Sequence, residues 1–205
     1  MTEIIQNLYI PIGLPCCGKS TFYKKMISHP DFCSTKIIGP DIIRERLFPG
    51  YEDGLIPFEN IDQEVAFLIA EREMEDYLLD GYSVWFDAMN THYKSRLILF
   101  HRGQAVEYTP LYPFILNYIL IKMNVDFDII KERNQKCRKG YRMPPIERLE
   151  SMNEYFNCIQ EEDLYLPGKL EIWNLQWQEQ DNKWIVVEGG ETCKRIVDIV
   201  NSTGA

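Results

Sequence analysis

Short apolar runs alternate with helical patterns over most of the chain. Runs at 8–12, 35–38 and 83–86 are each followed closely by Gly or Asp, which predicts short buried strands that end there. A fourth apolar run at 114–121 predicts another strand. Helices are predicted at 19–27, at 41–47, at about 59–79, from Asp126 or Asp128 to about 137, and from 144 onward.

Two of these helices carry more specific expectations. Asp41 stands at the start of its helix, where a side-chain oxygen can cap free backbone N–H groups. In the helix that ends near 79, helical spacing predicts that one face is buried in the core. The residues expected on that face are Ile61, Val65, Leu68 and Ile69.

The order of elements predicts an α/β fold. Strands that alternate with helices indicate a central, mostly parallel sheet flanked by helices. The stretches 170–177 and 184–187 flank a polar turn and predict a hairpin, and a short helix at 191–200 follows them. No role can be assigned from the sequence to the C-terminal segment 169–205.

The residues with the clearest chemistry follow the predicted strands. Gly13 to Ser20 come after the first strand, Asp41 after the second and Asp87 after the third. Ligands of such sheets bind outside the carboxyl ends of the strands. The sequence therefore predicts that these residues meet in one site.

The segment after the first strand matches the phosphate-binding pattern G-x-x-x-x-G-K-[ST]. The expected nucleotide-binding residues are Gly13, Leu14, Pro15, Cys16, Cys17, Gly18, Lys19, Ser20 and Thr21. In such a loop, backbone N–H groups surround a phosphate, the lysine reaches the β- and γ-phosphates, and the hydroxyl of the [ST] position binds Mg²⁺. Lys19 and Ser20 take these positions, so ATP and Mg²⁺ are the expected ligands. The two cysteines are interpreted as small fillers of variable positions.

Composition and charge narrow the class of protein. The chain has 205 residues and a formal net charge of −9, which argues against non-specific coating of nucleic acid but leaves room for a local basic groove. The six cysteines form no C-x-x-C pair, so a zinc ribbon or a thioredoxin-type site is not indicated. The sequence shows neither a secretory leader nor an apolar run of about 18 residues. A cytoplasmic protein without a membrane segment is expected, and no oligomeric state is indicated.

Three further groups have two readings each. Asp87 fits a metal-linked acid at the end of a strand, or an Asp that caps the next turn. Asp41 with Arg44 three residues later fits an acceptor-activating acid beside an orienting arginine, or a capping Asp beside a solvated Arg. The basic segment at about 131–145 fits a lid over the triphosphate, or a solvated helix face. Its cations are Lys131, Arg133, Lys136, Arg138, Lys139 and Arg142.

Four pieces of the sequence resemble the bacteriophage-type polynucleotide 5′-hydroxyl kinases and related small P-loop kinases. They are "GLPCCGKST", "IIGPDIIR", "VWFDAMN" and "ERNQKCRKG…PPIERLESM", and together they span about 7–156. The resemblance implies a P-loop kinase fold with a basic lid, in a single domain over 1–205. It also implies that Asp41 activates the acceptor, that Arg44 lies in the acceptor site, and that Lys19 and a lid arginine act in catalysis. Arg138 is the better match for that arginine, but an insertion makes Arg142 compete for the same contact with the nucleotide.

The resemblance implies transfer of the γ-phosphate of ATP to a hydroxyl, with the 5′ end of a polynucleotide as the leading acceptor. One departure is an extra residue between Asp87 and Asn90, relative to the D-x-N spacing of the family. A kinase of a small molecule, a nucleotide or a hydroxymethylated base in DNA is the main alternative. A non-catalytic nucleotide-binding switch is the other alternative.

Overall fold

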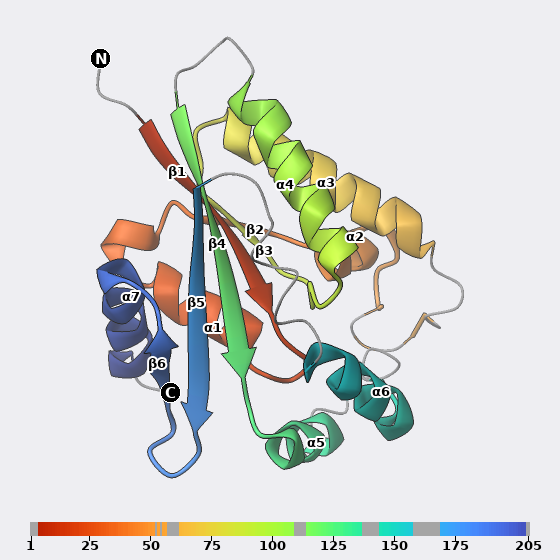
Figure 1. The fold of residues 1–205 in the computed structure, drawn as a ribbon. Coiled ribbons are helices and arrows are strands. Elements are labelled where there is room, and N and C mark those ends of the chain that lie inside the picture. Colours follow the sequence, from red (N-terminus) through yellow and green to blue (C-terminus); the bar gives the residue numbers. More distant parts are fainter. Residues whose placement is uncertain are drawn as a thin grey trace.

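The protein forms one six-stranded sheet with helices on both faces (Figure 1). The structure is a computed structural model that describes residues 4–51, 53, 55–56, 62–108, 114–136, 144–157 and 169–203. The strands are β1 (Ile4–Ile12), β2 (Lys36–Ile38), β3 (Val84–Phe86), β4 (Phe114–Asn124), β5 (Lys169–Gln178) and β6 (Lys183–Glu188). The helices are α1 (Lys19–Ile27), the 3-10 turn η1 (Pro30–Phe32), α2 (Pro40–Leu47), α3 (Gln63–Leu79), α4 (Tyr93–Glu107), α5 (Phe127–Lys136), α6 (Ile146–Asn157) and α7 (Glu191–Ser202).

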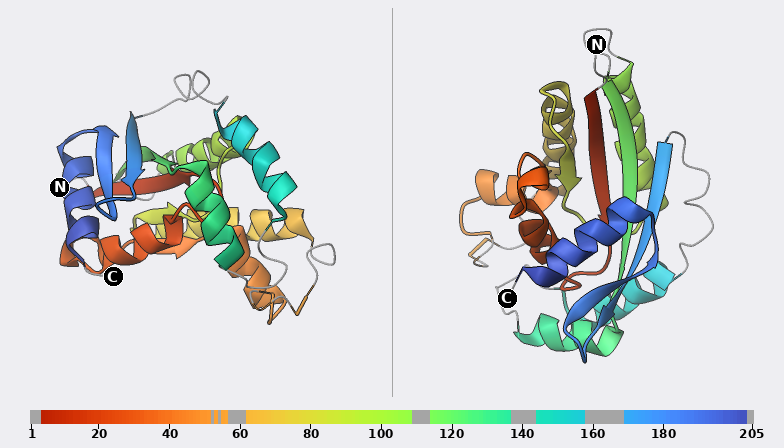
Figure 2. Two further views of the ribbon diagram at one scale, coloured as in Figure 1. Left: turned by 90° about the horizontal axis from the view of Figure 1, so that it is seen from below. Right: turned by 90° about the vertical axis from the view of Figure 1, so that its left-hand side faces the viewer.

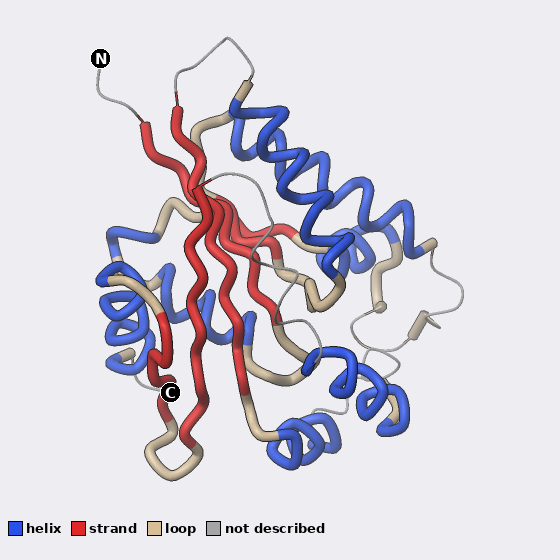
Figure 3. The backbone as a smooth tube through the Cα atoms, viewed as in Figure 1, coloured by secondary structure: helices blue, strands red, loops and turns tan. Residues whose placement is uncertain are grey.

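The sheet is mostly parallel, as the sequence predicts. Its strand order is β2-β3-β1-β4-β5-β6, and β6 alone in this sheet runs antiparallel to its neighbour. The tube in Figure 3 shows β1 and β4 side by side in the middle of the sheet. Leu8, Tyr9 and Ile10 of β1 are at most 1% exposed, because helices cover both faces of a central parallel strand.

Each face of the sheet has its own hydrophobic core. Tyr9 packs in a cluster with α1 and α7, whereas Leu8 and Ile10 pack in a second cluster with α2, α3 and α4. This division follows from the alternation of side chains along a strand. Figure 2 shows α7 beside α1 on the first face. Within the described ranges, no helix is both long and apolar enough to cross a membrane.

The predicted buried face of α3 is wrong. Val65 and Leu68 are 40% and 55% exposed, Ile69 is half-buried, and Ile61 lies outside the described residues. The side chains that face the core instead follow an i, i+4 repeat: Ala66, Ala70, Met74 and Leu78. Two alanines in the first half of this face are fully buried, whereas Val65 and Leu68 lie outside the contact and Ile69 packs against its edge.

The start of α2 differs from the prediction, and the start of α5 selects one of the two predicted capping residues. Asp41 does not cap α2, because Gly39 is the N-cap and Pro40 takes the first helical position, where its fixed φ suits a helix. In α5 the cap is Asp126, whose Oδ1 accepts a hydrogen bond from the Asp128 N–H at 2.8 Å. The side chain of Asp41 is therefore available for other contacts.

Helix α4 is not predicted from the sequence. Its buried residues follow helical spacing: Arg96, Leu99, Phe100, Gly103 and Val106. Arg96 and Gly103 interrupt the apolar residues of this face, so hydrophobic spacing alone does not reveal the helix. Gly103 is needed here because a Cβ at this position would lie 2.8 Å from the Tyr118 hydroxyl oxygen.

We predict that Gly103→Ala destabilises the protein. In an open helix this change would stabilise by about 1 kcal/mol, but a methyl group forced against Tyr118 is expected to cost about 1–3 kcal/mol. Chemical denaturation measures the difference in the free energy of unfolding. The double variant Gly103→Ala, Tyr118→Phe, compared with Tyr118→Phe alone, should lose less stability, because the nearest atom is gone. A stabilised Gly103→Ala variant would contradict this packing.

Candidate functional site

Three neighbouring strands deliver the predicted site residues to one edge of the sheet. β2, β3 and β1 are adjacent in the sheet, and backbone hydrogen bonds join the segments that follow them. The Asp87 N–H donates to the Ile38 carbonyl at 2.7 Å, and the Gly13 N–H donates to the Met89 carbonyl at 3.1 Å. A Cβ on Gly39 would lie 2.2 Å from the Asp87 carbonyl oxygen, so only glycine permits this approach. The predicted meeting of the three segments is confirmed.

The loop between β1 and α1 has two left-handed backbone positions just ahead of the helix. Cys16 and Gly18 have left-handed φ angles of 63° and 105°, and a Cβ on Gly13 would lie 2.6 Å from the Cys17 Sγ. Gly18 is the N-cap of α1 and has no side chain to bond the first N–H groups of the helix. Those N–H groups and the positive end of the helix dipole make a site for an anion.

Lys19 lies against this loop. Its side chain is 9% exposed, and Nζ donates to the carbonyl oxygens of Gly13 at 3.0 Å and Leu14 at 2.9 Å. Nζ is also 3.8 Å from the Cys17 Sγ. The ammonium group is thus held by the loop that the motif assigns to phosphates.

The structure brings the two predicted metal-linked residues together. The Ser20 hydroxyl donates to Asp87 Oδ2 at 2.7 Å, across the gap between α1 and the end of β3. Burial raises the pKa of the nearby Tyr23 hydroxyl, and the negative charge of Asp87 adds to that shift. One hydroxyl and one carboxylate fit Mg²⁺, which takes oxygen ligands and usually binds proteins through one or two of them.

Asp41 and Arg44 also form a pair, one turn apart in α2. Arg44 Nη1 donates to Asp41 Oδ1 at 2.5 Å, and the Tyr51 hydroxyl donates to the same oxygen at 3.4 Å. The Arg44 guanidinium lies 5.6 Å from the centre of the Phe67 ring. The Arg44 side chain is 7% exposed and that of Asp41 is 37% exposed, so the arginine is held in place while the carboxylate reaches solvent. Asp41 therefore does not cap the helix and Arg44 is not solvated, so the reading as a capping Asp beside a solvated Arg is wrong.

Asn90 and Arg96 tie the site together, and sequence reasoning assigned neither of them this role. Asn90 has a φ of 51°, and its buried amide donates to the carbonyls of Pro11 at 2.9 Å and Phe86 at 3.1 Å. Arg96, fully buried in α4, donates to the Asn90 carbonyl at 2.7 Å. Asn90 therefore links the ends of β1 and β3. Asparagine tolerates left-handed backbone, which is a weak sequence signal for the role of Asn90. The sequence gives no signal that Arg96 is buried.

The basic segment is described only in part. Arg138, Lys139 and Arg142 lie outside the described residues. Within α5, Lys131 pairs with Asp128 at 2.5 Å, and Lys136 pairs with Glu132.

A further contact ties α5 to the phosphate-binding loop. The buried Asn134 accepts from the Cys16 thiol at 3.9 Å and donates to the Pro144 carbonyl at 3.1 Å. This contact, which the sequence did not reveal, joins the loop to the start of the segment that leads into α6.

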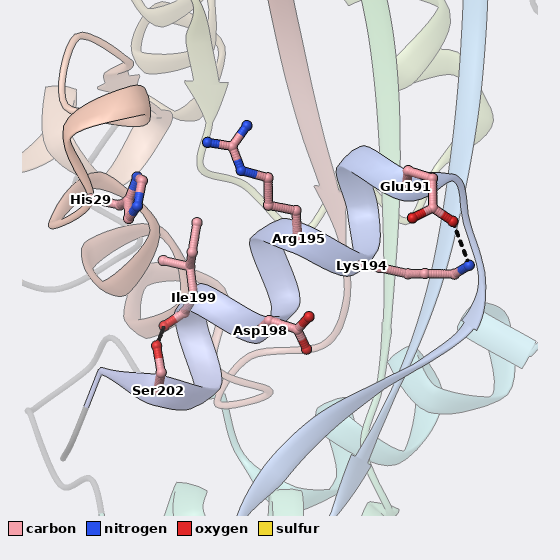
Figure 4. Close-up of a pocket in the computed structure, with 7 residues that line it drawn as sticks. All are labelled: His29, Glu191, Lys194, Arg195, Asp198, Ile199 and Ser202. Carbon is pink, nitrogen blue, oxygen red and sulfur yellow. Dashed lines mark hydrogen bonds and ion pairs between the residues drawn. The ribbon is translucent and has the colours of Figure 1, made fainter.

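Two hollows differ in their relation to this loop. One of about 280 Å³ lies beside it, lined by Leu14, by Asn124 at the end of β4, by Asp126, and by Asn153 and Phe156 of α6. A larger one of about 500 Å³ lies between α7 and His29, with no residue of the loop in its lining (Figure 4). In Figure 4 the charges of Lys194 and Glu191 face each other, joined by a 2.8 Å ion pair. The smaller hollow is the one placed to receive part of a ligand bound at the loop.

Comparison with known proteins gives structural matches alone. No protein-family model matches the sequence, and no curated protein matches it. A candidate kinase from Chloroflexus aurantiacus J-10-fl has 17% identity over 98% of this chain and 99% of its own, with a TM-score of 0.58. Kti12 from Chaetomium thermophilum, solved with ADP-AlF3, has 15% identity over 97% of this chain and 100% of its own, with a TM-score of 0.54.

A fungal RNA kinase has 15% identity over 98% of this chain and 83% of its own, with a TM-score of 0.50. At these identities, the likeness concerns the fold and not the reaction. The chain is similar to small P-loop kinases in the order and arrangement of its elements, and it has the α/β fold of P-loop kinase structures.

Proposed function

We propose that the protein is an ATP- and Mg²⁺-dependent kinase that transfers the γ-phosphate to a hydroxyl. The observation that carries the proposal is the 2.7 Å hydrogen bond from Ser20 to Asp87, next to a loop whose Gly13 and Leu14 carbonyls accept hydrogen bonds from Lys19. A hydroxyl and a carboxylate in contact at the start of a helix give Mg²⁺ its protein ligands beside bound phosphates. A fold shared with kinase structures supports the same conclusion.

On the donor side, the chain supplies positive charge and backbone N–H groups. Gly13 to Ser20 bind the phosphates, and Lys19 stabilises the negative charge that develops on the group in transfer. Ser20 and Asp87 would hold Mg²⁺, whose charge neutralises the phosphate oxygens when it is bound. The hollow beside Leu14 is the proposed place for the nucleoside of ATP.

On the acceptor side, Asp41 takes the proton of the attacking hydroxyl. Its carboxylate is partly exposed and fixed by Arg44, so it can reach a substrate while keeping one orientation. The oxygen then attacks the γ-phosphorus, the bond to the bridging oxygen breaks, and ADP leaves. Arg44 is proposed to orient the acceptor, and Arg138 or Arg142 to cover the phosphates.

The proposed acceptor is the 5′-hydroxyl of a polynucleotide. The sequence resemblance of the Asp41 and Asp87 segments supports it, and the fungal structure with a similar fold is that of an RNA kinase. A small hydroxyl compound is the second candidate. It is supported by Arg46 of α2, which is already paired with Glu73 and so offers less positive charge to a polynucleotide backbone.

We predict that Lys19→Ala lowers kcat by about 10²–10³, because it removes a charge that stabilises the transferring group. Steady-state kinetics and circular dichroism together separate this loss from unfolding. Lys24→Ala is the matched control, since it removes an exposed lysine from the same helix. Wild-type turnover by folded Lys19→Ala would refute the assignment of the loop.

We predict that Asp41→Asn lowers kcat by about 10²–10⁴ and leaves the affinity for ATP·Mg²⁺ within a factor of about two, since the acid serves the acceptor. Calorimetric titration with ADP·Mg²⁺ measures the affinity without turnover. Asp76→Asn, an exposed acid on α3, should change neither quantity. If nucleotide affinity falls together with activity, Asp41 belongs to the metal site or to the fold.

A transfer screen with γ-labelled ATP tests the acceptor. We expect label on 5′-hydroxyl DNA or RNA oligonucleotides, none on 5′-phosphorylated oligonucleotides, and none with the Asp41→Asn variant. Label on nucleosides or sugar nucleotides without label on oligonucleotides would support the second candidate. If ADP binds but no acceptor is labelled, the non-catalytic switch becomes the better description.

A further inference from the structure

The C-terminal segment, which the sequence left without a role, lies beside the predicted phosphate-binding loop. Trp184 of β6 is 5% exposed, and its Cζ2 lies 3.7 Å from the position that a Cβ on Gly18 would take. Its ring also packs edge-on against Phe22 of α1, with ring centres 6.2 Å apart. The indole therefore lies beside Gly18, the N-cap of α1, which has a left-handed φ of 105°.

The backbone of Trp184 is fixed from outside the sheet. β6 is the last strand of the sheet in the described part of the chain, where its outer edge pairs with no further strand. Asn201 of α7 takes that place: its Oδ1 accepts from the Trp184 N–H at 2.9 Å, and its Nδ2 donates to the Trp184 carbonyl at 2.8 Å. One amide side chain thus satisfies both backbone groups and holds the indole against the loop.

A second tryptophan, Trp177, connects Trp184 to α5. Trp177, opposite Trp184 in the hairpin, packs edge-on against it with ring centres 5.3 Å apart. The guanidinium of Arg133 lies 5.0 Å from the Trp177 ring, and Asn134 beside it contacts the Cys16 thiol of the loop. Trp177 and Trp184 therefore connect the elements that lie next to the two left-handed residues of the loop, Cys16 and Gly18.

We propose that Trp184 is a positioning residue that keeps the phosphate-binding loop in its binding conformation. Glycine has no conformational preference of its own for the left-handed turn, so a neighbour must limit its freedom. A loop that is already ordered loses less entropy when it binds an anion, and binding is tighter as a result. The inference rests on the proposed function in that the anion is taken to be the phosphates of a nucleotide.

Hydrogen exchange of the amides at 13–20, without nucleotide, tests the effect on the loop itself. We expect exchange to be about tenfold faster in Trp184→Ala, less so in Trp184→Phe, which keeps a ring, and also faster in Asn201→Ala, which removes both backbone bonds. Trp173→Phe is the control, because Trp173 is fully buried in the same core cluster and its ring pairs with Tyr9 of β1. Unchanged exchange in Trp184→Ala and Asn201→Ala overturns the inference, and so does an equal rise in Trp173→Phe.

Calorimetric titration with ADP·Mg²⁺ tests the consequence for binding. The dissociation constant should rise about tenfold in Trp184→Ala, which corresponds to about 1.4 kcal/mol, and stay within about twofold in Trp173→Phe. Normal affinity in a Trp184→Ala protein overturns the inference. A wild-type protein that binds no nucleotide, with exchange at 13–20 still dependent on Trp184, would remove the proposed function and leave Trp184 as the residue that orders the loop.

Discussion

The parallel pairing of β1 with β3 is the constraint on which the site depends. In this register Leu8 lies opposite Val84 and Tyr9 opposite Trp85, so the segments after both strands leave the sheet side by side. Ser20 can then meet Asp87, and Asn90 can reach back to the Pro11 carbonyl. A slip of one residue would turn every side chain of the strand to the opposite face and break these contacts.

The site concentrates buried positive charge in an acidic protein. The formal net charge is −9, yet Lys19 and Arg44 are each less than a tenth exposed and are held by carbonyl or carboxylate oxygens. Buried cations lose hydration, so they remain only where such oxygens hold them. The local field at the strand ends is therefore set by these two cations, by the carboxylates of Asp41 and Asp87 and by the start of α1 rather than by the total charge.

The C-terminal hairpin extends the sheet in a way that also supports the loop. β5 pairs with β4 in parallel, and the turn back into β6 places Trp184 over Gly18. Helix α7 then packs against α1 and supplies Asn201 to the open edge of β6. Residues from both ends of the chain thus meet beside the glycine-rich loop.

The sequence by itself determined the alternation of strands and helices apart from α4, the mostly parallel sheet and the position of the glycine-rich loop, because these depend on local periodicity and on a spacing that glycine geometry enforces. Tertiary structure decided the rest. Three features depend on which neighbours a residue meets: the exposed face of α3, the presence of α4, and the start of α2 at Pro40 rather than at Asp41. The contacts of Trp184 with Gly18 and of Asn134 with Cys16 join residues more than a hundred positions apart, and no local pattern carries that information.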